Sequence, residues 1–162
     1  MKTDRCVLLA EDDPNDVFFL QHAFKETGIQ NPLVAVGDGQ EAIDYLSGVG
    51  KYSDRKQFPF PGLLILDLKM PRKTGLDVLQ WLRQEDELRC VPTIMLSSSA
   101  HPTDVEKAYR LGVNAFVVKP PGTSERAELA RMIKSFWLTL NEAPLVCTDG
   151  LAAARKAPAG QL

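Results

Sequence analysis

The sequence has few features of a secreted or membrane protein. Its three cysteines are widely spaced among 162 residues and include no CxxC pair, which is not the pattern of a disulfide framework. No apolar run reaches membrane-spanning length, and the first run ends in three acids, unlike a signal peptide. We therefore expect a reduced, cytoplasmic protein that makes no membrane contact.

A large charge of one sign is also missing. The formal net charge is −2, and blocks of like charge are absent, so composition gives no reason to expect nucleic-acid binding. The chain is 44% hydrophobic, enough for one domain with a real core. We expect that domain to span residues 1–140. Residues 141–162 are rich in Ala, Pro and Gly, and we expect a largely disordered tail there.

Short apolar runs alternate five times with segments of helical spacing. The runs cover residues 6–10, 33–36, 63–66, 93–96 and 115–118. Each is apolar on both faces, which is typical of strands covered on two sides. Helix boundary residues support the intervening helices, for example Asp13 and Pro14 before the first and Gly28 after it. The last helical pattern covers 124–140. The alternation predicts a parallel sheet with helices on both faces.

Polar side chains follow the predicted strands at the points where they end. They are Glu11, Asp12 and Asp13 after the first strand, Asp67 after the third, Ser97, Ser98 and Ser99 after the fourth, and Lys119 after the fifth. Ligands of open α/β sheets bind at these carboxyl ends, so the side chains should converge. Converging carboxylates repel one another unless a cation is present, and oxygen ligands suit Mg²⁺. The pattern indicates a site that holds a phosphoryl group.

Four motifs in order carry a family resemblance: "LLAEDD", "LILDLKMPRKTG", "TIMLSSSA" and "AFVVKP". On these motifs the chain resembles a response-regulator receiver domain over about residues 5–140. The resemblance implies a flavodoxin-like α/β fold, a doubly wound five-stranded parallel sheet in the order 2-1-3-4-5 with five helices. The long segment 49–62, with its "FPFP", also resembles the single-domain regulators that partner bacterial phytochrome kinases.

The resemblance assigns roles to residues that match the motifs. Asp67 is the phosphoacceptor, and the set that organises Mg²⁺ is Glu11, Asp12, Asp67 and the backbone carbonyl of Lys69. The residues that bind the phosphoryl group or switch with it are Ser97, Lys119 and Phe116. The implied partners are a sensor histidine kinase, a separate downstream protein, and a second copy through the face of helix 4, strand 5 and helix 5. Tyr109 and Trp137 are further candidate anchors on that face.

Other interpretations fit the same residues less well. A pseudo-receiver that binds partners without phosphorylation is disfavoured by the complete set of site residues. A Mg²⁺-dependent phosphatase would want an acid two residues after Asp67, where Lys69 stands, so we expect no enzyme beyond assistance with its own phosphorylation. A flavodoxin-like cofactor binder is disfavoured because the acids after the first strand would repel a phosphate. Asp13 is better explained as a helix N-cap than as a metal ligand.

Overall fold

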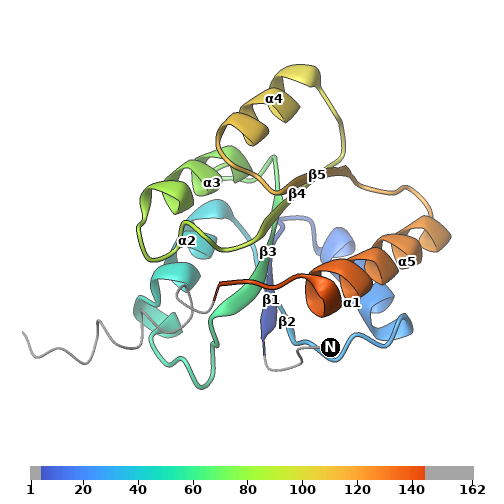
Figure 1. Ribbon diagram of the computed structural model, residues 1–162, viewed down its shortest axis with the longest axis horizontal. Coiled ribbons are helices and arrows are strands. Elements are labelled where there is room, and N and C mark those ends of the chain that lie inside the picture. Colours follow the sequence, from blue (N-terminus) through green and yellow to red (C-terminus); the bar gives the residue numbers. More distant parts are fainter. Residues whose placement is uncertain (1–4, 145–162) are drawn as a thin grey trace, which may run out of the picture.

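Five parallel strands form the centre of the molecule in the order β2-β1-β3-β4-β5 (Figure 1). The computed structural model describes residues 5–144, so most of the predicted tail lies outside the described residues. The strands are β1 Cys6–Ala10, β2 Leu33–Val36, β3 Pro61–Asp67, β4 Thr93–Ser97 and β5 Ala115–Val118. The helices are α1 Pro14–Glu26, α2 Gly39–Ser47, α3 Gly75–Gln84, α4 Pro102–Arg110 and α5 Thr123–Met132. The predicted strand order and the five helices are confirmed.

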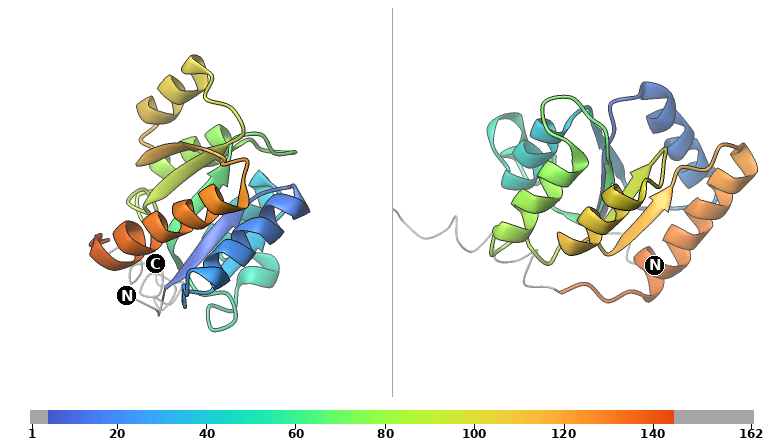
Figure 2. Two further views of the ribbon diagram at one scale, coloured as in Figure 1. Left: turned by 90° about the vertical axis from the view of Figure 1, so that its right-hand side faces the viewer. Right: turned by 90° about the horizontal axis from the view of Figure 1, so that it is seen from above.

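Two hydrophobic cores lie on opposite faces of the sheet. In β1, Leu8 and Ala10 pack with α2, α3 and α4, whereas Val7 and Leu9 pack with α1 and α5. Figures 1 and 2 show the corresponding helical layers on either side of the strands. Because successive side chains of a strand point to opposite faces, an unbroken apolar run fills both cores.

The two edge strands differ from the sequence prediction. We expected every strand to be covered on both faces, but β2 and β5 are only partly buried, and Val118 is 47% exposed. An edge strand has a neighbour on one side only, and helices cover it less completely. The short apolar runs therefore predicted strand position correctly and edge burial wrongly.

The ends of α1 follow the predicted signals. Asp13 caps the helix by accepting a hydrogen bond from the Asn15 amide at 2.8 Å, and Pro14 is the first helical residue. Gly28 follows with a φ of 68°, a left-handed conformation that glycine adopts without strain. The expectation that Asp13 is an N-cap is confirmed.

The last helix is less regular than its sequence pattern indicates. The α-helical part ends at Met132, and the chain continues as the π-helical segment η2, Ile133–Leu140. Lys134 in η2 donates a hydrogen bond to the Thr27 carbonyl at 2.8 Å, which ties this segment to the end of α1. Apolar spacing does not separate these two kinds of helix, since their turns differ by less than one residue.

Residues 49–60 form an ordered connection between α2 and β3, and the last two residues of the segment 49–62 belong to β3. The connection contains the short 3₁₀ helix η1, Gly50–Tyr52, and it brings Tyr52 and Phe58 against Tyr45 of α2, with ring centroids 4.9 to 6.1 Å apart. The Arg55 guanidinium donates to the carbonyls of Tyr45 and Leu46, each at 2.8 Å, and so satisfies acceptors at the end of α2.

Cys6 is a buried free thiol. Cys147 lies outside the described residues, so the expectation that all three cysteines are reduced stays a prediction. Among residues 5–144, no helix is long and apolar enough to cross a membrane.

Candidate functional site

Three carboxylates converge where β1 and β3 end. Glu11 directly follows β1, Asp67 is the last residue of β3, and the pairing of Ala10 with Leu66 brings the two ends side by side. Glu11, Asp12 and Asp67 each offer an oxygen, and these oxygens lie within 4.8 Å of one another. Glu11 and Asp67 are buried and Asp12 is exposed, so the cluster opens to solvent on one side. An all-oxygen set of this size fits a hard divalent cation.

Lys119 directly follows β5, the outermost strand on one side of the sheet, and its side chain extends to this cluster. Its Nζ lies 2.6 Å from Glu11 Oε2, 2.8 Å from Asp16 Oδ2 and 3.3 Å from Asp67 Oδ2. Its backbone amide donates to the Ser97 carbonyl at 2.7 Å, which fixes the residue just beyond β5. One ammonium group thus faces three carboxylates from three elements of the fold.

Burial and charge shift the pKa values of the central pair. Burial raises the pKa of Glu11 to about 7, although hydrogen bonds from Lys119 and from the Asp13 amide work against this rise. Burial alone would lower the pKa of Lys119, but the hydrogen bonds to Asp16 and Glu11 and the charge of Asp67 outweigh it and raise this pKa. Glu11 therefore sits where its own negative charge is costly without more positive charge nearby.

The other predicted site residues lie around the same sheet edge. Ser97 ends β4 and is buried, and its Oγ accepts a long hydrogen bond from the Ser99 amide at 3.3 Å. Phe116 of β5 pairs with Met95 of β4. Its side chain packs against the hydrophobic core on the side of α2, α3 and α4. Lys69 follows β3 with an exposed side chain. The structure thus places Glu11, Asp12, Asp67, Ser97 and Lys119 at the carboxyl ends of the strands and Phe116 within β5, and their chemical roles stay predictions.

The loop after β3 is held in a defined path. A Cβ at Gly75 would come within 2.2 Å of the Asp67 carbonyl oxygen, so only glycine permits this close approach. The Gly75 amide donates to the Leu68 carbonyl at 2.9 Å. Arg72 has a φ of 64° and forms an ion pair with Asp38 at 2.6 Å, which ties the loop to the start of α2. These contacts position the backbone on both sides of Lys69.

Asp16 is the site residue that sequence reasoning missed. It lies in the first turn of α1, where an acid is ordinarily explained by the positive end of the helix dipole. The available signal was its place one turn after the acids that follow β1. That signal becomes specific only when the end of β5 is known to bring Lys119 against the same turn.

The fold and the site together define a class of protein: a doubly wound parallel sheet with a cluster of carboxylates and a lysine at its carboxyl edge. The model of one family, described as the response regulator receiver domain, matches residues 7–134. The chain belongs to this family and is a response regulator of two-component signalling.

Known relatives cover most of the chain. The response regulator Rcp1 of a Synechocystis species is 32% identical over 83% of this chain and 89% of its own length, and its structure was solved in a Mn²⁺-bound form. The phosphorylated cyanobacterial phytochrome response regulator RcpA has a TM-score of 0.80 and 31% identity over 86% of this chain and 98% of that chain. RPA3017, a response regulator in red light signalling of R. palustris, has a TM-score of 0.82 and 35% identity over 86% and 98% of the two chains.

Proposed function

We propose that the protein accepts a phosphoryl group on Asp67 from a phosphohistidine of a sensor histidine kinase and signals through a changed surface of the receiver domain. The observation that carries the proposal is the convergence of three carboxylates with the Lys119 ammonium group 3.3 Å from Asp67. A receiver domain of residues 1–140 followed by a tail of residues 141–162 belongs to the same proposal.

The transfer needs charge neutralisation and alignment more than covalent help from the protein. A carboxylate oxygen of Asp67 attacks phosphorus, a P–O bond forms, and the P–N bond to the donor histidine breaks with its electron pair left on nitrogen. Asp67 is buried at a strand end, so its backbone holds it rigidly. Lys119 is close enough to Asp67 to follow the transferred group and to pair with one of its oxygens.

The residues present fit Mg²⁺. Glu11, Asp12 and Asp67 provide carboxylate oxygens, and we assign the fourth protein ligand to the backbone carbonyl of Lys69. When bound, Mg²⁺ supplies positive charge that offsets the negative charge of the acids and of the phosphoryl group. The raised pKa of Glu11 supports this assignment, because added positive charge would favour the ionised carboxylate. The Mn²⁺-bound form of Rcp1 supports a divalent ion in this family.

Phosphorylation would be reported through a changed surface. The Asp67 phosphoryl group adds strong acceptors near Ser97, whose hydroxyl accepts a long hydrogen bond from the Ser99 amide. Movement of the Ser97 side chain towards the phosphoryl group makes room for Phe116, one strand away, to turn inward. The face of α4, β5 and α5 then changes, which favours one of two packings. We assign the downstream partner or a second copy to this face, where Tyr109 is exposed.

The proposed kinase partner is of the phytochrome type. This assignment rests on the relatives, because RcpA is a phytochrome response regulator and RPA3017 functions in red light signalling. Receiver domains are signalling proteins, and the proposed chemistry is one transfer to Asp67 followed by slow hydrolysis.

Intact-mass measurement after incubation with acetyl phosphate and Mg²⁺ tests the proposal. We expect a single phosphoryl addition that is absent in EDTA and absent in Asp67→Asn. Asp86→Asn is the matched control, since it removes a highly exposed aspartate far along the chain from the site. An equal mass gain in Asp67→Asn would exclude this phosphoacceptor, and no gain in the parent protein would favour the pseudo-receiver.

A further inference from the structure

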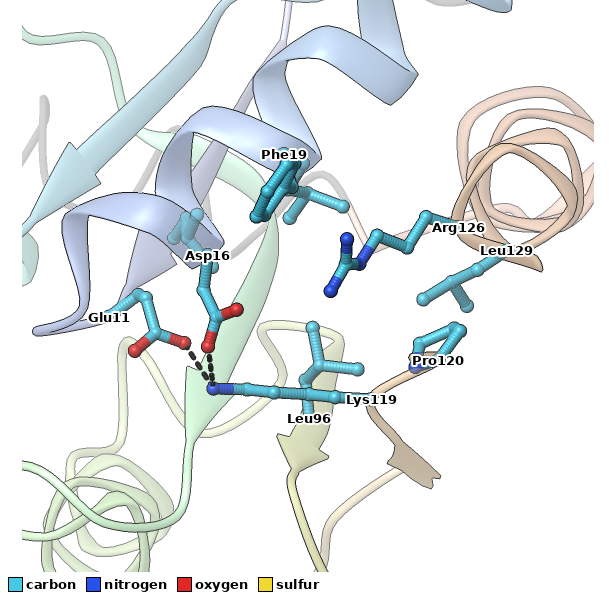
Figure 3. Close-up of a pocket in the computed structure, with 10 residues that line it drawn as sticks. Glu11, Asp16, Phe19, Leu96, Lys119, Pro120, Arg126 and Leu129 are labelled. Carbon is cyan, nitrogen blue, oxygen red and sulfur yellow. Dashed lines mark hydrogen bonds and ion pairs between the residues drawn. The ribbon is translucent and has the colours of Figure 1, made fainter. Parts of the chain in front are cut away.

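Asp16 is a carboxylate partner of Lys119 that the phosphotransfer scheme leaves unused. Its Oδ2 accepts a hydrogen bond from Lys119 Nζ at 2.8 Å, beside the bond that Glu11 Oε2 accepts at 2.6 Å. Figure 3 shows the end of the lysine facing both carboxylates, one just after β1 and one in the first turn of α1. Asp67 Oδ2 lies further from the same nitrogen, at 3.3 Å. The lysine is therefore held towards α1.

The residues around Asp16 leave Lys119 as its ion-pair partner. Among the described residues, the ion pair of Asp16 is with Lys119, whose side chain is 15% exposed against 31% for Asp16. Arg126 is the other cation that lines the pocket in Figure 3, and its guanidinium lies over the Phe19 ring, 4.3 Å from the centroid. Arg126 thus has a partner of its own.

We propose that Asp16 is a positioning residue that holds the Lys119 ammonium group on the α1 side of the site, leaving Asp67 available to the divalent cation and the phosphoryl donor. The inference rests on the proposed function. An ammonium group and a metal ion compete for the same carboxylate because both are cations. A lysine with two better acceptors, Asp16 and Glu11, competes less at Asp67 and still remains within reach of a phosphoryl group there.

Neutralising Asp16 removes one of the two acceptors that draw the lysine away. In Asp16→Asn the side-chain amide is a weaker partner, so Lys119 should spend more time against Asp67. Mg²⁺ must then displace it, and we expect the Mg²⁺ dissociation constant of Asp16→Asn to rise by about three- to tenfold, the size of one charge-assisted hydrogen bond in a partly exposed site. Asp16→Glu keeps the charge and should recover most of the affinity.

Calorimetric titration with MgCl₂ measures this effect directly. Asp13→Asn is the matched control, because it removes the same charge from the same end of α1 while asparagine remains a good N-cap. Asp13 is not among the ion-pair partners of Lys119. The loss of Mg²⁺ affinity in Asp13→Asn reports the general effect of charge. The additional loss of affinity in Asp16→Asn reports the positioning of Lys119.

A double-mutant cycle with Lys119→Met separates the two explanations further. If Asp16 acts through the lysine, Asp16→Asn in the Lys119→Met background should weaken Mg²⁺ binding no more than Asp13→Asn does. An undiminished effect in that background, or equal effects of Asp13→Asn and Asp16→Asn in the parent, would overturn the inference and leave the metal site standing. Absence of Mg²⁺ binding by the parent would overturn the metal site as well.

Discussion

Two glutamates of this protein each contact a lysine, and yet their pKa values shift in opposite directions. Glu11 lies 2.6 Å from Lys119 at the acidic site, and Glu41 lies 2.7 Å from Lys51 beside the segment 49–62. Burial raises the pKa of Glu11 to about 7. Hydrogen bonds from Lys51, Tyr52 and the Gly37 amide lower the pKa of Glu41 to about 2. One lysine partner therefore does not decide whether a carboxylate is favourably placed.

Burial and the other polar neighbours of each glutamate decide the direction of its pKa shift. The Glu11 side chain is 2% exposed and shares its lysine with two more carboxylates, whereas the Glu41 side chain is 25% exposed and has three donors of its own. The folded state thus favours the ionised form of Glu41 and disfavours the ionised form of Glu11. Functional sites commonly carry such a cost in stability. The two regions can be tested by matched substitutions.

Replacing the two lysines should give the largest contrast. We expect Lys119→Ala to weaken phosphorylation-driven switching by about 2–3 kcal/mol, since a partly buried charged partner of the phosphoryl group is lost. Mg²⁺ affinity should not fall, because the lysine is not a metal ligand and instead competes with the cation for Asp67. Lys51→Ala should leave both properties unchanged, since Lys51 is exposed and its ion pair is with Glu41 rather than with a carboxylate of the site.

The lysine prediction is checked by Mg²⁺ titration and by NMR of the parent and both variants with and without acetyl phosphate. Equal loss of metal affinity and switching in Lys119→Ala would show that the lysine merely supports the fold.

Glu11→Gln should weaken Mg²⁺ binding by about tenfold or more and yet stabilise the metal-free protein by about 1 kcal/mol at pH 8. The folded-state pKa of Glu11 lies above its ordinary value of 4.5. Its contribution to stability is therefore complete below about pH 4.5 and is lost as pH rises through about 7. The advantage of Glu11→Gln should grow across that range.

Urea unfolding of metal-free protein at pH 5 and pH 8 measures this difference. A variant that is less stable than the parent at pH 8 would contradict the view that Glu11 is unfavourably buried.

Glu41→Gln should change stability in the opposite direction. Its folded-state pKa of about 2 lies below the ordinary 4.5. Its contribution is present above about pH 4.5 and is lost as pH falls towards 2, so the variant should be less stable than the parent by about 1–2 kcal/mol at pH 7. The difference should shrink in urea unfolding at pH 3.5. A constant difference from pH 7 to pH 3.5 would mean that packing, not charge, is responsible.

These two regions were not equally predictable from the sequence. The acidic site follows from local signals: apolar runs fix the strand ends, and parallel strands bring those ends together. Glu11, Asp12, Asp67, Ser97 and Lys119 could therefore be placed at one edge. Gly28 could be placed at a helix end for a similar reason, because its φ is set by the turn that it makes.

The segment 49–62 could only be recognised as a long, turn-rich connection. Its contacts join residues whose proximity no local pattern encodes, such as Arg55 with the end of α2 and Tyr52 with Glu41. Asp16 was missed for the same reason, since its partner Lys119 is 103 residues away in sequence. Contacts of this kind depend on how the elements pack, and helix or strand periodicity carries no information about them.

The lifetime of the phosphoryl group gives the smallest expected effect and concerns a third lysine. Lys69 lies two residues after Asp67 with an exposed side chain, so it can extend across the path of an attacking water and pair weakly with the aspartyl phosphate. Ser99, two residues after Ser97, offers no strong base to orient that water. Slow self-dephosphorylation would suit a regulator that reports to a separate protein.

We expect Lys69→Ala to lose its phosphoryl group about two- to threefold faster than the parent, as for one exposed charge-assisted contact. Lys73→Ala removes the same charge from the same loop and should not alter the decay measured by intact mass. Unchanged or slower decay in Lys69→Ala would show that the lysine does not shield the site. Equal acceleration in both variants would assign the effect to general charge rather than to the position beside Asp67.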